Sequence, residues 1–558
     1  MKTALISVYN KQGIVDFAKE LISLDFKILA SGGTAKELTS AGVEVQDVAS
    51  LVGGGPILGH RVVTLSREVH AGLLAQDNEA DRAELKTLNI PFIDLVCVDL
   101  YPLQEEIAKH PLTRPDGHPL PQGEREKMTS AIIEKTDIGG PTMLRSAAKG
   151  RRIVICDPED RIKVIEWLKN GQPDKEFFIN KFCAKAEFTV ADYALASARY
   201  LSSGNIDGVV AHEVSALKYG ENGWQVPAGL FKNEIVDELS LANFNLLAGT
   251  TPSYNNLADV DRLLQTITHI AAGFEVNREL LDPRFRGDGQ KGVPKIAVGV
   301  KHGNPCGAAV NENPHMAIQN MLEGDLRAIF GGVVMVNFTV DEAAAEILLS
   351  YQMPEGQRRL LDGIIAPEFS AGAVEMLKRK GDKCRFLVNP ALANLSKASL
   401  DEHSRFRYVR GGFLKQPNYA FVLNLANAEI TGEISESQKA NIILGWAIGS
   451  TSNSNTVTIT KNNMLIGNGV GQQDRVSCCQ LAIKRATDAK HDVSGAAAYS
   501  DSFFPFVDGV ETLSSAGIQT IFATSGSVRD IEIKNFCKEK KINLVMLPDV
   551  QARGFFGH

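Results

Sequence analysis

Short apolar runs rich in β-branched residues alternate with amphipathic helical patterns over the first 200 residues. The strand-like runs are TALISV (3–8), FKILAS (26–31), DLVCVDLY (94–101) and RIVICD (152–157), and the helical patterns between the first of them are KQGIVDFAKELISL (11–24) and TAKELTSAG (34–42). Apolar strands separated by helices are typical of a parallel sheet that is covered on both faces. The sequence therefore predicts a doubly wound α/β domain, with ligands beyond the carboxyl ends of its strands.

A chain of 558 residues exceeds what one hydrophobic core accommodates, so we expect more than one domain. A long helical pattern at 180–201 runs into the polar segment SSGN (202–205), and we place the boundary there, giving domains 1–204 and 205–558. Beyond it, strand-like and helical patterns are more mixed, and KIAVGVKH (295–302) and TVTITK (456–461) are examples of the strands. Segments 110–124 and 277–292 have the composition of surface loops.

Composition excludes several classes of protein. The net charge of -7 and the isoelectric point of about 6.0 argue against a nucleic-acid-binding surface, which needs a basic excess. No apolar run reaches the length of a membrane span, so we expect no membrane association. The eight cysteines are scattered, without C-x-x-C or a His/Cys cluster of metal spacing. We therefore expect no metal, and a cytoplasmic protein with reduced thiols.

Two adjacent glycines separate an apolar strand from a helix in Ser31-Gly32-Gly33-Thr34. A plain turn explains them, and so does a phosphate site, because unpaired N–H groups at a helix start bind anions and glycine permits close approach. Three further residues are expected at the same sheet edge, where they could contact the anion: Lys11, Arg61 and Thr64.

A second group of polar residues follows the later strands of the first domain. Tyr101 comes directly after a strand, and Asp137 precedes another glycine pair and a helix that carries Lys149. The three side chains could perform acid–base chemistry on a small molecule. The alternative is a helix-capping aspartate with a solvated lysine.

The most unusual stretch is GVKHGNPCGAAV (299–310), where a strand delivers Lys301 and His302 into a glycine-rich turn. A neighbouring ammonium group disfavours imidazolium, so His302 is expected to be a neutral base. The PCGA segment is close to the zinc deaminase signature P-C-x-x-C, but position 309 is alanine and no H-x-E precedes it, so a zinc site is not expected.

Three later segments carry candidate residues. Asn455 in SNSNTV can stabilise an oxyanion through its amide group. Gln473 lies in GNGVGQQDRV, and SDSFFPFVDG offers phenylalanines beside a proline, which form either core packing or a slot for a flat ring.

Taken in order, these motifs resemble one family. The matching segments are SGGTAKEL, DLYP, DIGGPTMLRSAAK, KYGEN, KHGNPCGAA, FGG, DGIIAP, GNGVGQQDR and SFFPF. The chain resembles the bifunctional purine-biosynthesis family that joins a transformylase for 5-aminoimidazole-4-carboxamide ribotide (AICAR) to an IMP cyclohydrolase. The resemblance spans essentially the whole chain.

The resemblance implies an N-terminal methylglyoxal-synthase-like domain with a parallel sheet, which closes formyl-AICAR to IMP with loss of water. The turn Ser31 to Thr34, with Lys11, Arg61 and Thr64, would hold the ribotide phosphate. Tyr101, Asp137 and Lys149 would act in ring closure.

The resemblance also implies a C-terminal transformylase domain of two cytidine-deaminase-like α/β subdomains without zinc. There His302, tuned by Lys301, would be the base for formyl transfer from 10-formyltetrahydrofolate to AICAR, with Asn455 near the formyl oxygen. The expected AICAR-binding residues are Lys218, Tyr219, Asp362 and Phe556, and the expected folate-binding residues are Phe503, Pro505, Gln473 and Asp508. The family is a homodimer, so we expect one here.

The chain departs from the family pattern at a few positions. Val63 stands where the family has lysine in R-V-K-T, Lys218 and Trp224 replace arginine and histidine, and Ser450 replaces a lysine. Two alternatives therefore remain, a transformylase with an impaired cyclohydrolase and a non-catalytic ribotide-binding regulator. A phosphate-eliminating lyase like methylglyoxal synthase would explain the first domain only.

Overall fold

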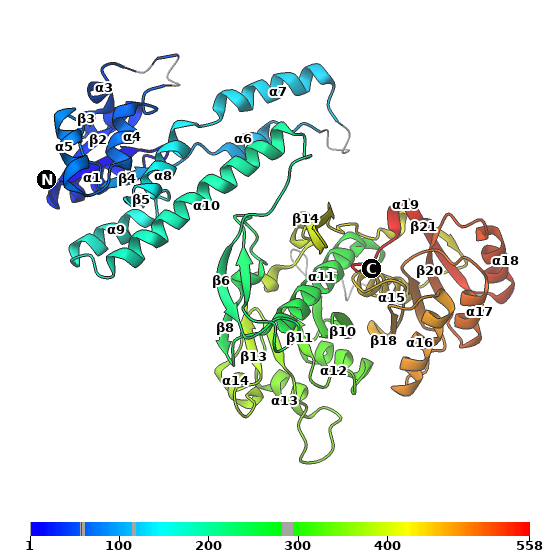
Figure 1. The fold of residues 1–558 in the computed structure, drawn as a ribbon. Coiled ribbons are helices and arrows are strands. Elements are labelled where there is room, and N and C mark those ends of the chain that lie inside the picture. The colour runs from blue at the N-terminus through cyan, green and yellow to red at the C-terminus, as the bar shows by residue number, and fades with distance from the viewer. Residues whose placement is uncertain (1, 56, 59–61, 114–118, 282–293, 558) are drawn as a thin grey trace. The chain divides into compact units, whose positions relative to one another are not determined.

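The computed structural model describes residues 2–557 except 56, 59–61, 114–118 and 282–293. The chain forms two compact units, 1–212 and 213–558 (Figure 1). The boundary lies eight residues beyond the one expected from the sequence. Helix α10 (Lys175–Leu201) ends close to the expected position, but Arg199 pairs with Asp207 at 2.6 Å and keeps the following segment attached to the first unit.

The first unit contains the predicted parallel sheet. Its five strands have the order β3-β2-β1-β4-β5, and all neighbouring pairs are parallel. The strands are β1 (Lys2–Ser7), β2 (Phe26–Ala30), β3 (Gln46–Asp47), β4 (Leu95–Val98) and β5 (Ile153–Ile155). From β1 the chain adds β2 and β3 on one side of the sheet, and then adds β4 and β5 on the other side. The carboxyl ends of β1 and β4 are therefore the topological switch point, where ligands bind in such sheets.

Helices cover both faces of this sheet. Alternate residues of β1 point to opposite sides, so Ala4 and Ile6 join one apolar core and Leu5 joins the other. The helices are α1 (Ile14–Ser23), α2 (Gly32–Ser40), α3 (Val48–Leu51), α4 (Arg67–Leu74), α5 (Glu79–Thr87), α6 (Leu103–Lys109), α7 (Gln122–Lys135), α8 (Gly139–Lys149), α9 (Asp160–Lys169) and α10. This confirms the doubly wound architecture expected from the strand and helix patterns.

The second unit is built on a mixed twelve-stranded sheet of order β16-β21-β20-β19-β17-β18-β10-β9-β11-β12-β13-β8. Read inward from either edge, the pairings are antiparallel, parallel, parallel, antiparallel and antiparallel, and the two halves meet where β10 pairs with β18. The two halves therefore share one topology, although the sequence shows no repeat.

Each half runs strand, helix, two strands, and then three helix–strand units. The first half comprises β8 (Asn245–Ala248), α11 (Tyr254–Val276), β9 (Lys295–Lys301), β10 (Asn304–Asn311), α12 (Pro314–Gly324), β11 (Val333–Val336), α13 (Glu342–Ser350), β12 (Gly363–Ala366), α14 (Ala371–Leu377) and β13 (Arg385–Val388). The second comprises β16 (Glu429–Thr431), α15 (Glu436–Gly449), β17 (Thr456–Lys461), β18 (Met464–Val470), α16 (Arg475–Asp488), β19 (Ala497–Ser500), α17 (Asp508–Ser515), β20 (Thr520–Ser525), α18 (Asp530–Lys540) and β21 (Asn543–Pro548).

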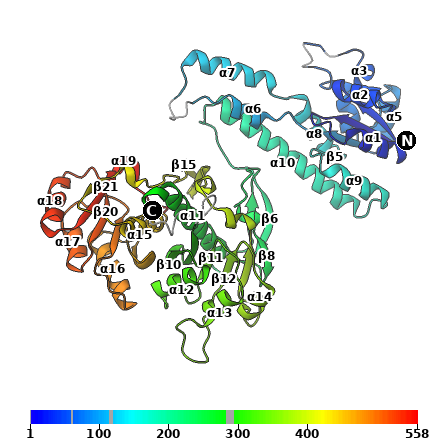
Figure 2. The ribbon, with the colours of Figure 1, turned by 180° about the vertical axis from the view of Figure 1, so that it is seen from behind.

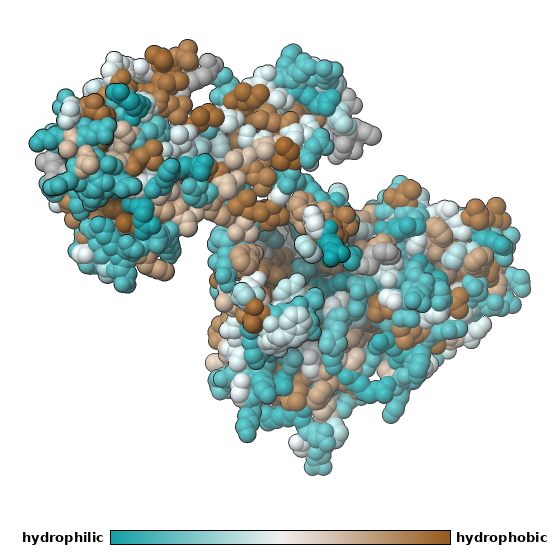
Figure 3. Space-filling view, in the orientation of Figure 1, coloured by the Kyte–Doolittle hydropathy of each residue, from teal (hydrophilic) through white to brown (hydrophobic). Residues whose placement is uncertain are grey.

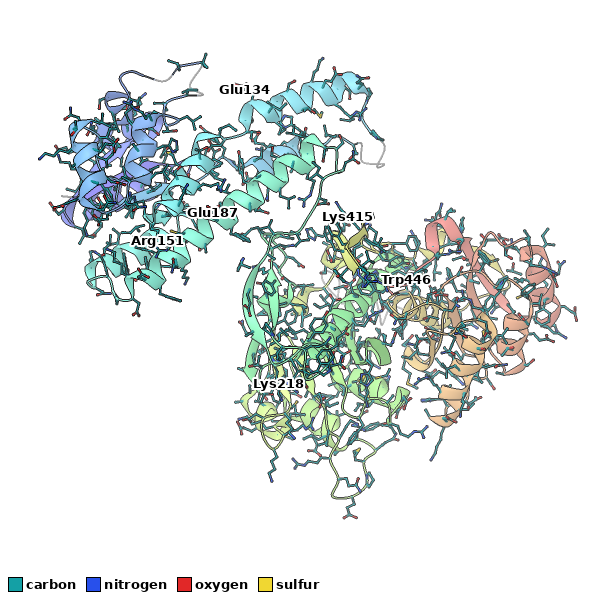
Figure 4. All side chains as sticks on the ribbon, viewed as in Figure 1. Glu134, Arg151, Glu187, Lys218, Lys415 and Trp446 are labelled. Atoms are coloured by element: carbon teal, nitrogen blue, oxygen red, sulfur yellow. The ribbon has the colours of Figure 1, made fainter. Side chains whose placement is uncertain are left out.

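Helices α11 and α15 pack together on one face of this sheet, and the other helices of the two halves cover the opposite face (Figure 2). Trp446 of α15 is fully buried and lies against α11, where a Cβ atom on Gly273 would be 2.8 Å from the indole (Figure 4). Glycine at this position therefore permits the close approach of the two helices.

Smaller elements complete the second unit. Two hairpins, β6 (His212–Leu217) with β7 (Ala228–Lys232) and β14 (Ser404–Val409) with β15 (Gly412–Pro417), lie outside the large sheet, and α19 (Asp549–Ala552) is near the end of the chain. Hydrophilic side chains cover much of the surface at the end of the unit where α13 and α14 lie (Figure 3). Among the described residues no helix combines the length and apolar character that a membrane span requires.

Two candidate active sites

The glycine turn of the first unit lies at the switch-point edge of the sheet. The Nζ atom of Lys11 donates to the Oγ1 atom of Thr34 at 2.9 Å, and the N–H of Val8 donates to the same oxygen at 3.1 Å. The hydroxyl groups of Ser7 and Ser31 are 2.7 Å apart. The structure thus brings Lys11, Ser31 and Thr34 together where β1 and β2 end.

The glycine pair leaves open space above this cluster. Gly32 adopts a φ of 46°, which favours glycine, and among the described residues no atom outside the adjoining chain and the helix backbone lies within 4 Å of the Cβ positions of Gly32 or Gly33. The side chain of Ser31 makes no capping hydrogen bond to α2. The first N–H groups of α2 are therefore available to an anion.

Asp99, at the end of β4, holds the turn that carries Lys11. Its Oδ1 atom accepts hydrogen bonds from the N–H groups of Tyr9 and Asn10, and its Oδ2 atom accepts one from Arg161 at 3.1 Å. Burial raises the pKa of Asp99 and lowers the pKa of Lys11, and the attraction between the two charges opposes both shifts. Sequence reasoning missed Asp99 as a site residue, although it begins the quoted DLYP motif.

A second polar group surrounds the start of α8. The carboxylate of Asp137 accepts from the N–H of Gly140 at 2.9 Å, and the backbone N–H of Asp137 donates to the hydroxyl of Tyr193 at 2.7 Å. Burial raises the pKa of Asp137, against the hydrogen bonds from the glycine N–H groups. Thr64 also lies here, because its Oγ1 atom is 2.7 Å from where a Cβ atom of Gly139 would be.

Of the remaining predicted residues of the first site, Tyr101 lies near Tyr193, which contacts Asp137, and Lys149 lies far from Asp137. Tyr101 is 54% exposed, and its ring lies 5.2 Å from that of Tyr9 between centroids. Tyr101 is close enough to Tyr193 to influence the pKa of Tyr193, which burial raises to about 12. Lys149 is exposed at the other end of α8, about 15 Å from Gly139 by helical rise, so one protomer does not bring it to Asp137. Arg61 lies outside the described residues.

In the second unit, Lys301 is the last residue of β9, and His302 and Gly303 form the turn to β10. His302 has a φ of 95°, and the N–H groups of His302 and Gly303 donate to the Oδ1 atom of Asp259 at 3.3 and 2.7 Å. Lys301 donates to the carbonyl of Phe330 at 2.5 Å. Burial raises the pKa of Asp259, and the Gly303 N–H opposes this shift. Asp259 therefore fixes the turn that presents the imidazole.

Strand register places the His302 turn and Asn455 at the same edge of the large sheet. Ala309 of β10 pairs with Met464 of β18 in antiparallel register, so the start of β10 lies beside the end of β18, which in turn adjoins the start of β17. The N–H of Asn453 donates to the Oδ1 atom of Asn304 at 3.3 Å across this joint. A cavity of about 290 Å³ opens beside Lys301 and His302.

The amide of Asn455 is held by its own half of the sheet. Its Nδ2 atom donates to the carbonyl of Gln472 at 2.9 Å. Next to it, Asp501 accepts from the N–H of Thr456 at 3.1 Å and pairs with Arg475 in a buried ion pair. Sequence reasoning did not identify Asp501, although it lies within the quoted SDSFFPFVDG segment.

Three of the predicted AICAR-binding residues lie around the start of α11, and the fourth, Phe556, lies against Arg262 of the same helix. The carbonyl of Tyr219 accepts from the N–H of Tyr254 at 3.3 Å, which docks the KYGEN segment on this helix, and Lys218 lies just beyond β6 (Figure 4). Asp362 pairs with Arg379 at 2.6 Å and is close enough to Asp259 to influence its pKa. Phe556 is instead buried, with guanidinium groups over its ring at 3.5 Å from Arg405 and 4.6 Å from Arg262.

The predicted folate-binding residues lie in the second half of this unit. The guanidinium of Arg553 is 5.7 Å from the ring centroid of Phe503, and the carboxylate of Asp508 accepts from the N–H of Gly509 at 2.8 Å. Pro505 and Gln473 are exposed, and Phe504 is buried in the core. Within the described part of the chain, no group of three or more His, Cys, Asp or Glu side chains is placed to hold a metal ion.

Comparisons with known proteins match both units. Residues 13–142 match the MGS-like domain, and residues 147–485 match the AICARFT/IMPCHase bienzyme family. The bifunctional purine biosynthesis protein PurH of Bacillus cytotoxicus is 34% identical over 98% of each chain, and that of Staphylococcus epidermidis is 32% identical over 98% of each chain. The protein of the same name from Anoxybacillus flavithermus is 34% identical over 95% of each chain. A structure titled "Crystal structure of ForH" is 32% identical, covers 36% of this chain and 98% of that chain, and has a TM-score of 0.30.

Proposed function

The chain belongs to the AICARFT/IMPCHase bienzyme family, and from that premise we propose that its second unit formylates AICAR and its first unit closes the product to IMP. These reactions are the last two steps of IMP biosynthesis. The observation that carries the proposal is the His302 turn, which lies with Asn455 at one sheet edge beside a cavity.

For the transformylase reaction, the AICAR amine is a weak nucleophile because the ring and the carboxamide delocalise its lone pair. We propose that His302 takes the amine proton as the nitrogen attacks the formyl carbon of 10-formyltetrahydrofolate. The bond from that carbon to N10 then breaks, and the proton passes to N10. Asn455 would stabilise the oxyanion of the tetrahedral intermediate.

For ring closure, we propose that Lys11, Ser31 and Thr34 bind the ribotide phosphate with the free N–H groups of α2. The carboxamide nitrogen of formyl-AICAR then attacks the formyl carbon, and water is lost as the second ring forms. Asp137 and Tyr101 border Tyr193 and are suited to moving the proton in this step. Lys149 lies too far from Asp137 to act on the same substrate within one protomer. In a dimer, the Lys149 side chain could instead act at the ring-closure site of the partner protomer.

Val63 supports a second candidate, a transformylase whose cyclohydrolase is impaired. The side chain of Val63 is partly buried against the apolar core that includes Leu5, Val96 and Met143. It therefore offers packing, and no charge, where the family pattern has a lysine. A non-catalytic ribotide-binding regulator is the third candidate, and the retained Lys301, His302 and Asn455 argue against it.

We propose a homodimer, with 10-formyltetrahydrofolate as formyl donor and without a required metal. The folate would contact Phe503, Pro505, Gln473 and Asp508, and AICAR would contact Lys218, Tyr219, Asp362 and Phe556. We also propose a cytoplasmic location, with the functional domains spanning 1–204 and 205–558.

Product identification by mass spectrometry tests the proposal. Purified protein with AICAR and 10-formyltetrahydrofolate is expected to yield IMP, and formyl-AICAR supplied alone is expected to yield IMP faster than in buffer. If formyl-AICAR accumulates in the first reaction and is not converted in the second, the impaired cyclohydrolase is favoured. Val63→Lys should then restore ring closure.

Site-directed variants separate catalysis from binding. His302→Ala should abolish formyl transfer, whereas His403→Ala should not, because His403 is an exposed histidine of the same unit that pairs with Asp401 at 3.0 Å. Normal formyl transfer by His302→Ala would refute the role given to His302. Absence of both products from the unsubstituted protein would favour the ribotide-binding regulator.

A further inference from the structure

A cavity of about 570 Å³ in the second unit opens between the end of α13, the segment before β12 and the segment after α14. Helices α13 and α14 pack side by side here. Among the residues that the structure describes, no acidic side chain lines the cavity, although the whole chain has a net charge of -7. Its charged lining residues are Arg358, Arg359, Lys378, Arg379, Lys380 and Lys383.

Arg359 is the buried member of this group, with 2% of its surface exposed. Its guanidinium donates to the carbonyl groups of Leu348 at 2.9 Å and Tyr351 at 2.7 Å, and no carboxylate among the described residues pairs with it. Its Nε atom is buried without a hydrogen-bond partner in the same part of the chain. A buried guanidinium without a counter-ion is costly, and a bound anion would offset that cost.

Neighbouring carboxylates neutralise only part of the positive charge. Arg379 pairs with Asp362 at 2.6 Å, and Lys378 pairs with Glu375. The other three cations are exposed and have no ion pair within the described residues; they are Arg358, Lys380 and Lys383.

The ends of two helices account for only part of this cluster, because Arg359 donates to carbonyl groups at the end of α13. Lys378 and Lys380 follow α14 directly, where cations are favoured by the helix dipole. Arg358 comes from the segment before β12, and Lys383 lies six residues beyond the end of α14, whereas the dipole effect falls off within the last turn. Two separate segments, one before β12 and one after α14, therefore contribute cations to one cavity.

We propose that this cavity binds a polyanion whose linked phosphate or carboxylate groups span the cationic side chains. Guanidinium groups match the geometry of either oxyanion, and lysines add point charges. The volume is within the range of small-molecule sites. The site is separate from the cavity beside His302, and the inference does not rest on the proposed reactions.

Calorimetric titration of the full-length protein tests this site with two probes, inorganic tripolyphosphate and citrate, at low ionic strength. Saturable binding of either probe is expected, weakening as salt is added. Tighter binding of tripolyphosphate would identify the natural ligand class as a polyphosphate, and tighter binding of citrate would identify it as a polycarboxylate. No saturable binding of either probe would overturn the proposal.

Charge-reversal variants locate the binding. Lys380→Glu with Lys383→Glu should weaken the preferred probe at least tenfold, while Lys490→Glu with Lys538→Glu should change its affinity less than twofold. The control pair consists of exposed lysines of the same unit outside the cavity and produces the same change in net charge. Equal weakening by both pairs would show that net charge alone attracts the anion, and would overturn the site. Circular dichroism confirms that each variant is folded.

Discussion

Two partly buried carboxylates each hold a turn that carries a candidate functional side chain. Asp99 accepts the N–H groups of Tyr9 and Asn10, next to Lys11, and Asp259 accepts those of His302 and Gly303. In both cases burial raises the pKa of the carboxyl group, and the backbone hydrogen bonds oppose the shift. A carboxylate that accepts backbone N–H groups therefore positions Lys11 in the first unit and His302 in the second.

Asp259→Asn should lower kcat for formyl transfer by about 10- to 100-fold, because hydrogen bonds to a charged acceptor are worth about 1.5–3 kcal/mol. The KM for AICAR should change much less, since Asp259 contacts the turn and not the substrate. Steady-state kinetics measure both values. Asp341→Asn is the matched control, because Asp341 accepts the N–H of Ala344 at 2.8 Å at the start of α13. Equal losses in the two variants would show a general effect on stability.

Ring closure should depend on pH through Asp137. If Asp137 acts as the base, only its ionised form is active, so kcat/KM for formyl-AICAR rises as pH rises through its pKa. Burial raises that pKa, so the rise should occur above the range of an ordinary aspartate. The pH profile of the unsubstituted protein and of Asp137→Asn measures this, and the variant should lack the rise. A rate that falls with increasing pH in this range would make Asp137 an acid.

At the scale of elements, the start of α8 shows why its glycine pair is needed. Gly139 lies against Thr64, and Gly140 lies against both Asp137 and Leu100. A side chain at Gly139 would occupy the space of the Thr64 hydroxyl, and one at Gly140 would occupy the space of the Asp137 carboxylate. The helix start thus positions Asp137 through shape as well as through hydrogen bonds.

Gly140→Ala should impair ring closure and destabilise the first unit. The added Cβ atom would lie 2.4 Å from the Oδ2 atom of Asp137 and 2.7 Å from Leu100, and such overpacking costs about 1–3 kcal/mol. Gly123→Ala in α7 is the control, since its Cβ atom would meet no atom of another described part of the chain within 4 Å and alanine favours a helix. Thermal denaturation and the rate of IMP formation from formyl-AICAR measure the effects. An active, fully stable Gly140→Ala variant would contradict this account.

Local patterns in the sequence predicted the main strands of the first unit. The apolar runs at 3–8, 26–31, 94–101 and 152–157 became strands of one parallel sheet, because a fully buried strand must be apolar on both faces. The duplicated topology of the second unit was not predictable, since its halves share strand order and not residue identity. Asp259 was missed for a related reason: it lies within a helix, 43 residues before the turn that it holds.

At the scale of the whole molecule, each unit has apolar cores of its own. The core clusters of the first unit contain no residue of the second, and the reverse also holds among the described residues. Formyl transfer is energetically weak, so rapid removal of its product by the other unit would draw it forward. Fusion of two independently packed units can supply that advantage without a shared site.

The two activities should therefore fail independently. His302→Ala should lose formyl transfer yet convert supplied formyl-AICAR to IMP at the unsubstituted rate, because no core residue of the first unit is disturbed. Asp137→Asn should retain formyl transfer and accumulate formyl-AICAR. Separate assays of the two half-reactions, with product identification by mass spectrometry, measure all four rates. If either variant also slowed the other reaction severalfold, the units would be coupled, and the benefit of fusion would lie in communication between the sites and not only in product removal.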